Sequence, residues 1–176
     1  MTEAEHRKRL LDLLDQIPTG VPAGWEKETL AVGGLMYLGF SNLQTEKLVV
    51  ISSQRQSVID CGTGEKTCCE ENYDEQDLIA CAEPLGDELI PIAGLEGGGL
   101  RRSSPAGDGL YLAAPFWPRE QIIFMPQYVS WWYQNPERCT VIFDDYGVLA
   151  WGFSRCGDYL AIGTSSDLHI FRRTGE

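Results

Sequence analysis

Positively charged residues are scarce in this sequence. Its 176 residues include 14 lysines and arginines against 26 aspartates and glutamates, which gives a net charge of −12 at pH 7 and an isoelectric point near 4.5. A surface of this sign repels nucleic-acid phosphates and anionic lipid headgroups. The charge therefore argues against nucleic acid and membranes as partners, and the class of partner that it favours is a basic protein.

Long apolar runs are also missing. No stretch approaches the roughly 20 apolar residues that a membrane helix needs, and the first residues, MTEAEHRKRL, lack the apolar core of an export signal. These absences predict a cytoplasmic protein. In a reducing compartment cysteines are expected to be free thiols, and no pair of them has Cys-x-x-Cys spacing. The six cysteines are Cys61, Cys68, Cys69, Cys81, Cys139 and Cys156.

Ligands for a metal ion are few. One histidine, His6, lies near the start of the chain and the other near its end, and the adjacent Cys68-Cys69 would point apart in an extended segment. A zinc site would have to draw on distant residues such as Cys61, Cys81 and His169. The acidic run 70–77 lacks the Asp-x-Asp-x-Asp-Gly order of a calcium loop and predicts a solvated turn. The sequence therefore predicts neither a metal nor a cofactor.

Side chains suited to catalysis are equally sparse. His169 alternates with Leu168 and Ile170, which places it on the opposite face of its strand, as a surface residue or as one half of a Cys–His pair. Asp144-Asp145 could serve as an acid/base pair. These aspartates directly precede the predicted turn Tyr146-Gly147, where Asp is common for backbone reasons. We predict no catalytic residue.

Two segments of the chain, 34–64 and 147–175, have matching residues. Each begins with a glycine, carries the triplet Gly-Phe-Ser, and matches its counterpart again at the next apolar run and at a serine. The pairs are Gly34 with Gly147, Gly39-Phe40-Ser41 with Gly152-Phe153-Ser154, Lys47-Leu48 with Tyr159-Leu160, and Ser53 with Ser165. The match indicates duplication of one structural unit, and convergence between antiparallel strands is the alternative.

Each segment has the pattern of antiparallel strands joined by turns. In the second segment, apolar residues alternate over 149–153, a turn follows at Gly157-Asp158, and the apolar run 159–162 completes a hairpin with one buried face. Alternation over 168–173 predicts a third strand. The first segment repeats the plan, with its third strand at 58–61.

The string GFSRCGDYLAIGTSSDLHIFRRTG resembles the strand-turn-strand-turn-strand core of a WD40 blade and, more loosely, propeller blades in general. The Trp-Asp position of such a blade holds Ile59-Asp60 in the first segment and Phe171-Arg172 in the second, and the Gly-His dipeptide is absent. The resemblance covers 31 residues of the first segment and 29 of the second. Because a blade takes about 40 to 45 residues, the resemblance implies a disk of about four blades.

The remaining chain carries one helix signal and several strand signals. Thr2 and Glu5 have capping-box spacing, and leucines recur at helical spacing, which predicts a helix over about 3–17 that covers a face or rim of the β structure. Further strands are predicted at 89–93, 110–114, 121–125 and 139–143. Residues 21–33 are predicted to form an irregular connector, 65–77 a turn, and 78–82 either a short helix or a strand.

These signals together define the expected fold class. No shift in composition marks an internal boundary, so residues 1–176 are predicted to form a single domain. Strand signals every 8 to 12 residues are typical of a mainly β, antiparallel protein. We expect a propeller-like architecture, or a barrel or sandwich, built around two related hairpin repeats, with an N-terminal α-helix.

The loop GLEGGGLRR is a candidate for anion binding. It lacks the Lys-Ser/Thr of a phosphate loop, but consecutive glycines beside arginines can form a backbone concavity that holds a small anion. The residues of this candidate site are Gly97, Gly98, Gly99, Arg101 and Arg102. A flexible hairpin loop is the alternative interpretation.

The strongest binding candidate is a stretch rich in aromatic residues. Besides Phe124 of the predicted strand 121–125, six aromatics lie between residues 116 and 133, near prolines that stiffen a loop. They are Phe116, Trp117, Tyr128, Trp131, Trp132 and Tyr133. Consecutive residues 131–133 cannot all face one core, so at least one is expected to be exposed or covered by another element or chain. Trp and Tyr dominate interface hot spots, which predicts partner or ligand contact here, with core filling as the alternative.

The function that these observations favour is a non-enzymatic, cytoplasmic protein-interaction module. Within this class, the small size, the acidic charge and the lack of a predicted catalytic site are consistent with an immunity-type protein that neutralises a basic toxin. The alternative is a hydrolase or small-molecule-binding protein that uses acidic residues and the glycine-rich loop.

Overall fold

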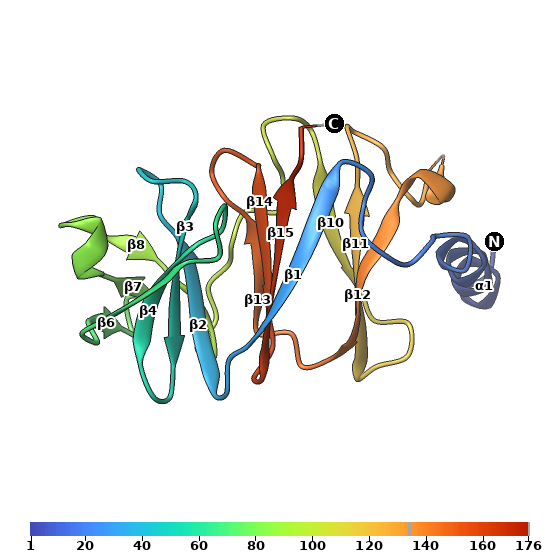
Figure 1. Ribbon diagram of the computed structural model, residues 1–176. Coiled ribbons are helices and arrows are strands. Elements are labelled where there is room, and N and C mark those ends of the chain that lie inside the picture. The colour runs from blue at the N-terminus through green and yellow to red at the C-terminus, as the bar shows by residue number, and fades with distance from the viewer. Residues whose placement is uncertain (134, 176) are drawn as a thin grey trace.

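The protein consists of four antiparallel sheets and one α-helix stacked side by side. A computed structural model describes residues 1–133 and 135–175 (Figure 1). From left to right in Figure 1 the layers are sheet I (β6-β7-β8), sheet II (β5-β4-β3-β2-β9), sheet III (β1-β15-β14-β13), sheet IV (β10-β11-β12) and helix α1. The mainly β, antiparallel fold with an N-terminal helix confirms the predicted fold class.

Sheet II is built from the first repeated segment. Its centre is β2 (Leu35–Phe40), β3 (Lys47–Ser52) and β4 (Gln56–Asp60), which pair in chain order as predicted. Its two edges are β5 (Lys66–Cys69), which pairs with β4, and β9 (Ala93–Gly94), which pairs with β2.

Sheet III is built from the second segment and from a strand that the sequence did not predict. β13 (Ala150–Phe153), β14 (Tyr159–Gly163) and β15 (Asp167–Arg173) pair in chain order. β1 (Trp25–Ala31) adds to the outer edge of β15, so the connector predicted for residues 21–33 was wrong over these residues. Most side chains of β1 are exposed, which removes the apolar alternation by which a strand is recognised.

Sheet IV and α1 form the right-hand end of the stack. The sheet contains β10 (Gly109–Ala113), β11 (Arg119–Met125) and β12 (Thr140–Tyr146), with the short 3-10 helix η2 (Pro136–Arg138) before β12. Helix α1 (Glu3–Leu14) begins at the predicted capping box but ends three residues before the predicted position 17. There the amide of Ile17 bonds to the Leu14 carbonyl, three residues back, in a tighter turn.

Sheet I is small and corrects three local predictions. It contains β6 (Tyr73–Asp74), β7 (Ile79–Ala80) and β8 (Ile90–Pro91), with the 3-10 helix η1 (Glu83–Leu85) between the last two. Residues 65–77, predicted as a turn, contain β5 and β6, and the open choice for 78–82 resolves to strand β7. The strand predicted at 89–93 is divided, because β8 pairs in sheet I and β9 pairs in sheet II.

An apolar core fills the space between each pair of neighbouring layers. Along β3, Leu48 and Val50 face the core shared with sheet III, whereas Val49 and Ile51 face the core shared with sheet I. Sheet III is likewise covered on both faces, because Leu168 and Ile170 pack towards sheet II and Phe171 packs towards sheet IV. The alternation of β-strand side chains thus divides each central strand between two cores.

The fourth core lies between sheet IV and α1. Leu10, Leu13 and Leu14 of the helix pack on Ile123 and Val141 of the sheet. The apolar stripe of the helix therefore covers one face of the β structure, as predicted from its leucine spacing. In the described part of the chain, no helix has the length and apolar character needed to cross a membrane.

Candidate functional site

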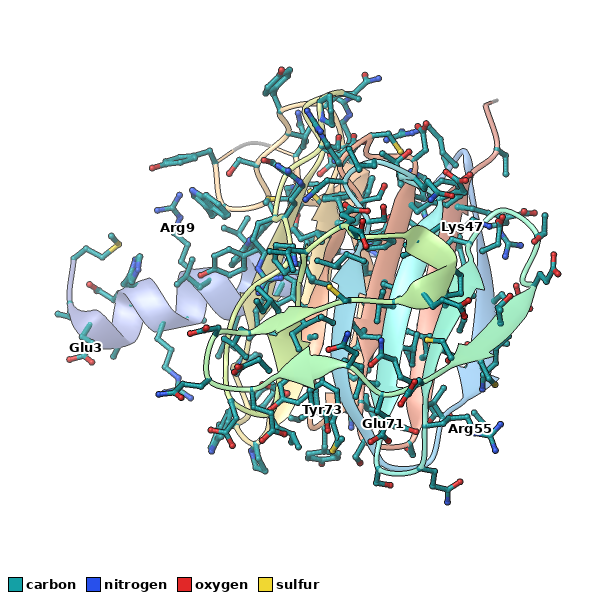
Figure 2. All side chains as sticks on the ribbon, turned by 90° about the vertical axis from the view of Figure 1, so that its left-hand side faces the viewer. Glu3, Arg9, Lys47, Arg55, Glu71 and Tyr73 are labelled. Atoms are coloured by element: carbon teal, nitrogen blue, oxygen red, sulfur yellow. The ribbon has the colours of Figure 1, made fainter. Side chains whose placement is uncertain are left out.

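The negative charge of the protein is concentrated at one end of the stack. Residues 65–96, which form sheet I and both edge strands of sheet II, contain ten carboxylates and one lysine. They account for −9 of the net charge of −12. We call this region the acidic end. Figure 2 looks onto it, with Glu71 and Tyr73 labelled.

The carboxylates of the acidic end are not neutralised internally. Among residues 1–133 and 135–175, no lysine or arginine forms an ion pair with any of the ten carboxylates. Two of them have structural tasks: Asp74 accepts hydrogen bonds from the amides of Gln76 and Asp77, and Glu88 accepts from the loop after β2. The others leave an uncompensated negative field.

Two clefts lie at the acidic end. One, of about 590 Å³, is lined by Glu71, Asn72, Tyr73, Asp74 and Glu75. A second, of about 370 Å³, runs between Glu70, Glu71, Asn72, Cys81, Glu83, Gly86 and Asp87. Asp74 is the last residue of β6, and its side chain accepts a hydrogen bond from the turn that follows. A solvated turn was predicted over residues 70–77. Within the described residues, no three His, Cys, Asp or Glu side chains converge as metal ligands.

An aromatic pair, Tyr73 with Tyr37, links the acidic end to β2. The Tyr73 ring lies 5.9 Å from the ring of Tyr37, which is 1 % exposed on β2. Burial, followed by the charge of Glu75, raises the pKa of Tyr37, so its hydroxyl stays protonated at neutral pH. This ring contact belongs to the apolar core through which sheet I packs on sheet II.

The predicted aromatic site does not form a single patch. Trp131 is 3 % exposed in the core between sheet IV and α1, and Trp132 is half-buried against it. The side chains of Trp117, Tyr128 and Tyr133 are exposed, at 74 %, 86 % and 77 %. The prediction that residues 131–133 cannot share one core agrees with this arrangement.

The exposed aromatics also lie at different ends of one strand. Trp117 precedes β11, whereas Tyr128 and Tyr133 follow it. Seven residues of extended chain span about 20 Å, so Trp117 is remote from the other two along the strand direction. Clustering along the sequence thus did not translate into clustering on the surface.

The two arginines of the glycine-rich loop diverge. The guanidinium of Arg102 stacks on the indole of Trp151, 3.3 Å from the ring centroid, and burial lowers its pKa to about 10, so it stays charged at neutral pH. Arg101 turns the other way, towards Asn42. The amide of Gly97 donates to the Gly94 carbonyl, so it is already used within the loop. The anion site predicted from residues 97–102 therefore does not form as one unit.

Arg101 instead belongs to a cleft that the sequence did not indicate. This cleft, of about 220 Å³, lies between the turns after β2 and β13, and we call it the tip cleft. It is lined by Phe40, Asn42, Pro91, Gly99, Leu100, Arg101, Phe153 and Arg155. Of the predicted loop residues, Gly99 and Arg101 take part. Asn42 and Arg155 were missed, although both directly follow the matched serines of the repeat.

Asp144, Asp145 and His169 line a further cleft, of about 310 Å³, between sheets III and IV. Both aspartates lie in β12, so the strand predicted at 139–143 continues through Tyr146, and Gly147 follows it with positive φ. Asp144 is engaged by Arg119 at 2.6 Å. His169 Nδ1 lies 2.9 Å from Oγ1 of Thr29, its neighbour on β1, and burial followed by the charge of Lys27 lowers its pKa.

This arrangement lacks the connections of a catalytic group. Within the described residues, no hydrogen bond joins His169 to Asp144 or Asp145. Thr29 is the direct cross-strand partner of His169, so their contact follows from the pairing of β1 with β15. Nucleophilic catalysis requires a base that is hydrogen-bonded both to its nucleophile and to an orienting group. The cleft does not meet that requirement.

Burial raises the thiol pKa of three cysteines, Cys61, Cys69 and Cys139. Burial raises the pKa of Cys61 to about 12 and that of Cys139 to about 11. All six cysteines are free thiols, and Cys68 is exposed. A thiolate nucleophile needs the opposite shift, towards a lower pKa.

The comparisons with known proteins gave no match: no family model, no curated protein and no solved structure is significantly similar to this chain. The resemblance of both repeated segments to WD40 blades therefore stays a prediction.

Proposed function

We propose that this protein is a non-enzymatic interaction module that binds a basic partner protein at its acidic end. The observation that carries the proposal is the concentration of −9 of the −12 net charge in residues 65–96. Like charges held close together repel one another, and a basic surface placed against them relieves that repulsion. Complementary charge also steers and accelerates association.

The structure of the acidic end supports a docking role. Glu70, Glu71 and Glu75 are exposed, and no ion pair within the described residues competes for them. The underlying core between sheets I and II is continuous, so the carboxylates are presented on a supported surface. Preorganised groups bind with a smaller loss of conformational entropy.

The finer proposal is an immunity-type role, in which the basic partner is a toxin that this protein neutralises. An acidic surface that covers a basic active site would block access to the toxin's substrate. A cytoplasmic location is part of the same proposal. Its test is to express the captured partner alone and together with this protein, and to measure cell growth.

The primary test is affinity capture from a cell lysate, in which the wild-type protein is compared with a variant that lacks three carboxylates of the acidic end. Glu70→Gln, Glu71→Gln and Glu75→Gln together should weaken capture of the basic partner about tenfold, because each exposed charge contributes a fraction of a kcal/mol. Capture by the wild-type protein should weaken as the salt concentration rises. Mass spectrometry identifies the partner, and titration with the purified partner gives the affinity.

The matched control makes the same charge change at the other end of the stack. Asp12→Asn, Asp15→Asn and Glu137→Gln alter exposed carboxylates near α1 and η2, and should leave the affinity unchanged. Trp117→Ala and Tyr133→Ala test the aromatic residues in the same assay. Equal weakening by both charge triples would show a dependence on net charge alone. If only the aromatic variants lose affinity for the partner, the binding site lies at the sheet IV end instead.

The alternative function, a hydrolase or small-molecule-binding protein using acidic residues and the glycine-rich loop, divides over two places in the structure. The loop residues Gly99 and Arg101 line the tip cleft, whereas Asp144 and Asp145 line the cleft between sheets III and IV. No single site joins them. Of the two activities in this alternative, the tip cleft favours small-molecule binding over hydrolysis.

A further inference from the structure

The tip cleft is formed by two turns of the same construction. The Ser41 amide donates to the Lys47 carbonyl and its Oγ accepts from the Gln44 amide. In the second segment, the Ser154 amide donates to the Tyr159 carbonyl and its Oγ accepts from the Tyr159 amide. Each serine thus closes the turn between the first two strands of its segment, which fixes the residue that follows it.

A crossing segment completes the cleft. A Cβ added to Gly39 would lie 2.5 Å from the carbonyl oxygen of Pro91, and one added to Gly152 would lie 2.6 Å from the carbonyl oxygen of Arg101. Glycine at both matched positions therefore lets the segment 90–102 run in close contact with β2 and then with β13. The Phe153 amide holds the Arg101 carbonyl at 2.8 Å, which places the Arg101 side chain at the cleft.

Two guanidinium groups converge on this cleft from different parts of the chain. Nη2 of Arg101 lies 3.5 Å from Oδ1 of Asn42, and Nη1 of Arg155 lies 3.4 Å from the Asn42 carbonyl oxygen. Both contacts are at the long limit for hydrogen bonds. No carboxylate of residues 1–133 or 135–175 lies within 4.0 Å of either group. In so acidic a protein, two cations facing one cleft without an anion are a distinctive arrangement.

One carboxylate lies behind the first turn and is already engaged. Glu88 accepts hydrogen bonds from Oγ of Ser41 at 2.5 Å and from the amide of Asn42 at 2.7 Å. Its oxygens are directed at the backbone of the turn rather than at the guanidiniums. Glu88 therefore positions Asn42 at the cleft while leaving both arginines available for a ligand.

The floor of the cleft is apolar. Phe40 and Phe153, the matched phenylalanines of the two triplets, are 6 % and 1 % exposed, and Leu100 and Pro91 complete the lining. The space of about 220 Å³ accommodates a small ligand. Arginine favours oxyanions because its planar fork of donors matches their geometry.

We propose that the tip cleft binds a small molecule that carries an oxyanion, a phosphate or a carboxylate, on a compact apolar body. Arg101 and Arg155 contact the oxyanion, the Asn42 side chain adds a polar contact, and Phe40 and Phe153 support the apolar body. The ligand class is distinct from the basic protein proposed for the acidic end, and neither proposal depends on the other.

The test is titration of the full-length protein with inorganic phosphate, phenyl phosphate and benzoate at constant ionic strength. Binding is followed by calorimetry and by amide NMR shifts of Asn42, Gly99 and Arg101. We expect phenyl phosphate to bind more tightly than inorganic phosphate, because its ring covers the apolar floor. The benzoate arm shows whether a carboxylate replaces the phosphate. Arg101→Gln and Arg155→Gln should each weaken phenyl phosphate binding at least tenfold, as expected when one charged hydrogen-bond partner is lost.

Arg102→Gln is the matched control. It removes the same charge one residue away, from a side chain that stacks on Trp151 outside the cleft, and should leave the affinity for phenyl phosphate within about twofold of wild type. An equal loss in Arg102→Gln would show that net charge alone attracts the anion and would overturn the assignment. Shifts no larger than those given by chloride would overturn it as well. Inorganic phosphate binding as tightly as phenyl phosphate would overturn the role of the apolar floor.

Discussion

The two repeated segments share their backbone geometry and differ in what surrounds them. Gly34 and Gly147 both adopt positive φ, at +68° and +72°, before the first strand. Gly39 and Gly152 both admit a crossing segment. The first segment forms sheet II, which gains β5 and β9 and packs between sheets I and III. The second segment forms most of sheet III, which gains β1 and packs between sheets II and IV. The matched residues therefore maintain chain geometry, and the unmatched ones adapt each segment to its layer.

The largest test of this comparison is to add a methyl group at the matched glycines. Gly39→Ala and Gly152→Ala should each lower the free energy of unfolding by about 1 to 3 kcal/mol, because backbone of the crossing segment occupies the space of the new Cβ. Urea unfolding followed by circular dichroism measures the change. Gly33→Ala, where no atom lies within 4 Å of the new Cβ, should stay within about 0.5 kcal/mol of wild type. Equal effects at all three sites would contradict the claim that Gly39 and Gly152 are glycine because a crossing segment lies against them.

The matched serines provide the second test. Ser154→Ala should cost about 1 kcal/mol, since the turn loses one hydrogen-bond acceptor. Ser41→Ala should cost about 2 kcal/mol, because the Ser41 hydroxyl also donates to the charged Glu88. Thermal and urea unfolding give both values. A larger loss in Ser154→Ala than in Ser41→Ala would contradict the role assigned to Glu88.

A third test uses a position at which the segments differ in charge, Asp60 in the first and Arg172 in the second. Burial alone would raise the pKa of Asp60, but the Lys47 ammonium at 2.9 Å and the amides of Gly62 and Thr63 outweigh it and lower the pKa. A lowered folded-state pKa stabilises the fold above the unfolded pKa of about 3.9, and this stability is lost as the pH falls through the folded value.

Asp60→Asn should therefore cost about 1 kcal/mol at pH 7 and should reduce the fall in stability below about pH 4. Urea unfolding over a series of acidic pH values measures both effects. Asp158→Asn is the control, because that carboxylate is 58 % exposed and pairs with Arg173 at 3.3 Å. If stability falls below about pH 4 as steeply in Asp60→Asn as in the wild type, then Asp60 is not held in its ionised form by Lys47 and the turn.

The smallest effect is expected at His169, which has no titrating counterpart in the first segment. Burial and Lys27 lower its pKa, so the unfolded state binds the proton more readily. The protein should lose a little stability as the pH falls from about 6.5 towards the lowered value. His169→Gln should flatten this part of the profile, and the exposed His6→Gln should leave it unchanged. A steeper slope in His169→Gln would reverse the sign of the proposed shift.

The sequence was sufficient where a local pattern determines the structure. The capping box at Thr2 and the strands of both repeated segments follow from periodicity and turn residues. It failed at β1, whose residues Trp25–Ala31 are stabilised by a partner strand almost 150 residues away and carry no apolar alternation of their own. The strand predicted at 139–143 ended too early, because pairing with β11 extends β12 through Tyr146, beyond its apolar residues.

The tip cleft shows the same limit for a candidate site. Gly99 and Arg101 could be proposed because glycine and arginine lie together in the sequence. Asn42 and Arg155 are brought to the cleft only by the packing of sheets II and III. The repeat nevertheless held a signal: each of these residues directly follows a matched serine, so the repeat places both at equivalent turns.

The pairing of β1 with β15 has a consequence for how the protein is synthesised. Sheet II uses strands that leave the ribosome within the first 94 residues, so its pairing partners are present early. Sheet III needs Trp25 opposite Arg173, so its outer strand stays without a partner until residues 167–173 have been translated. Long-range strand pairing is slow and leaves edges exposed meanwhile. Nascent chains stalled before residue 167 should therefore resist protease over sheet II while β1 is still cleaved.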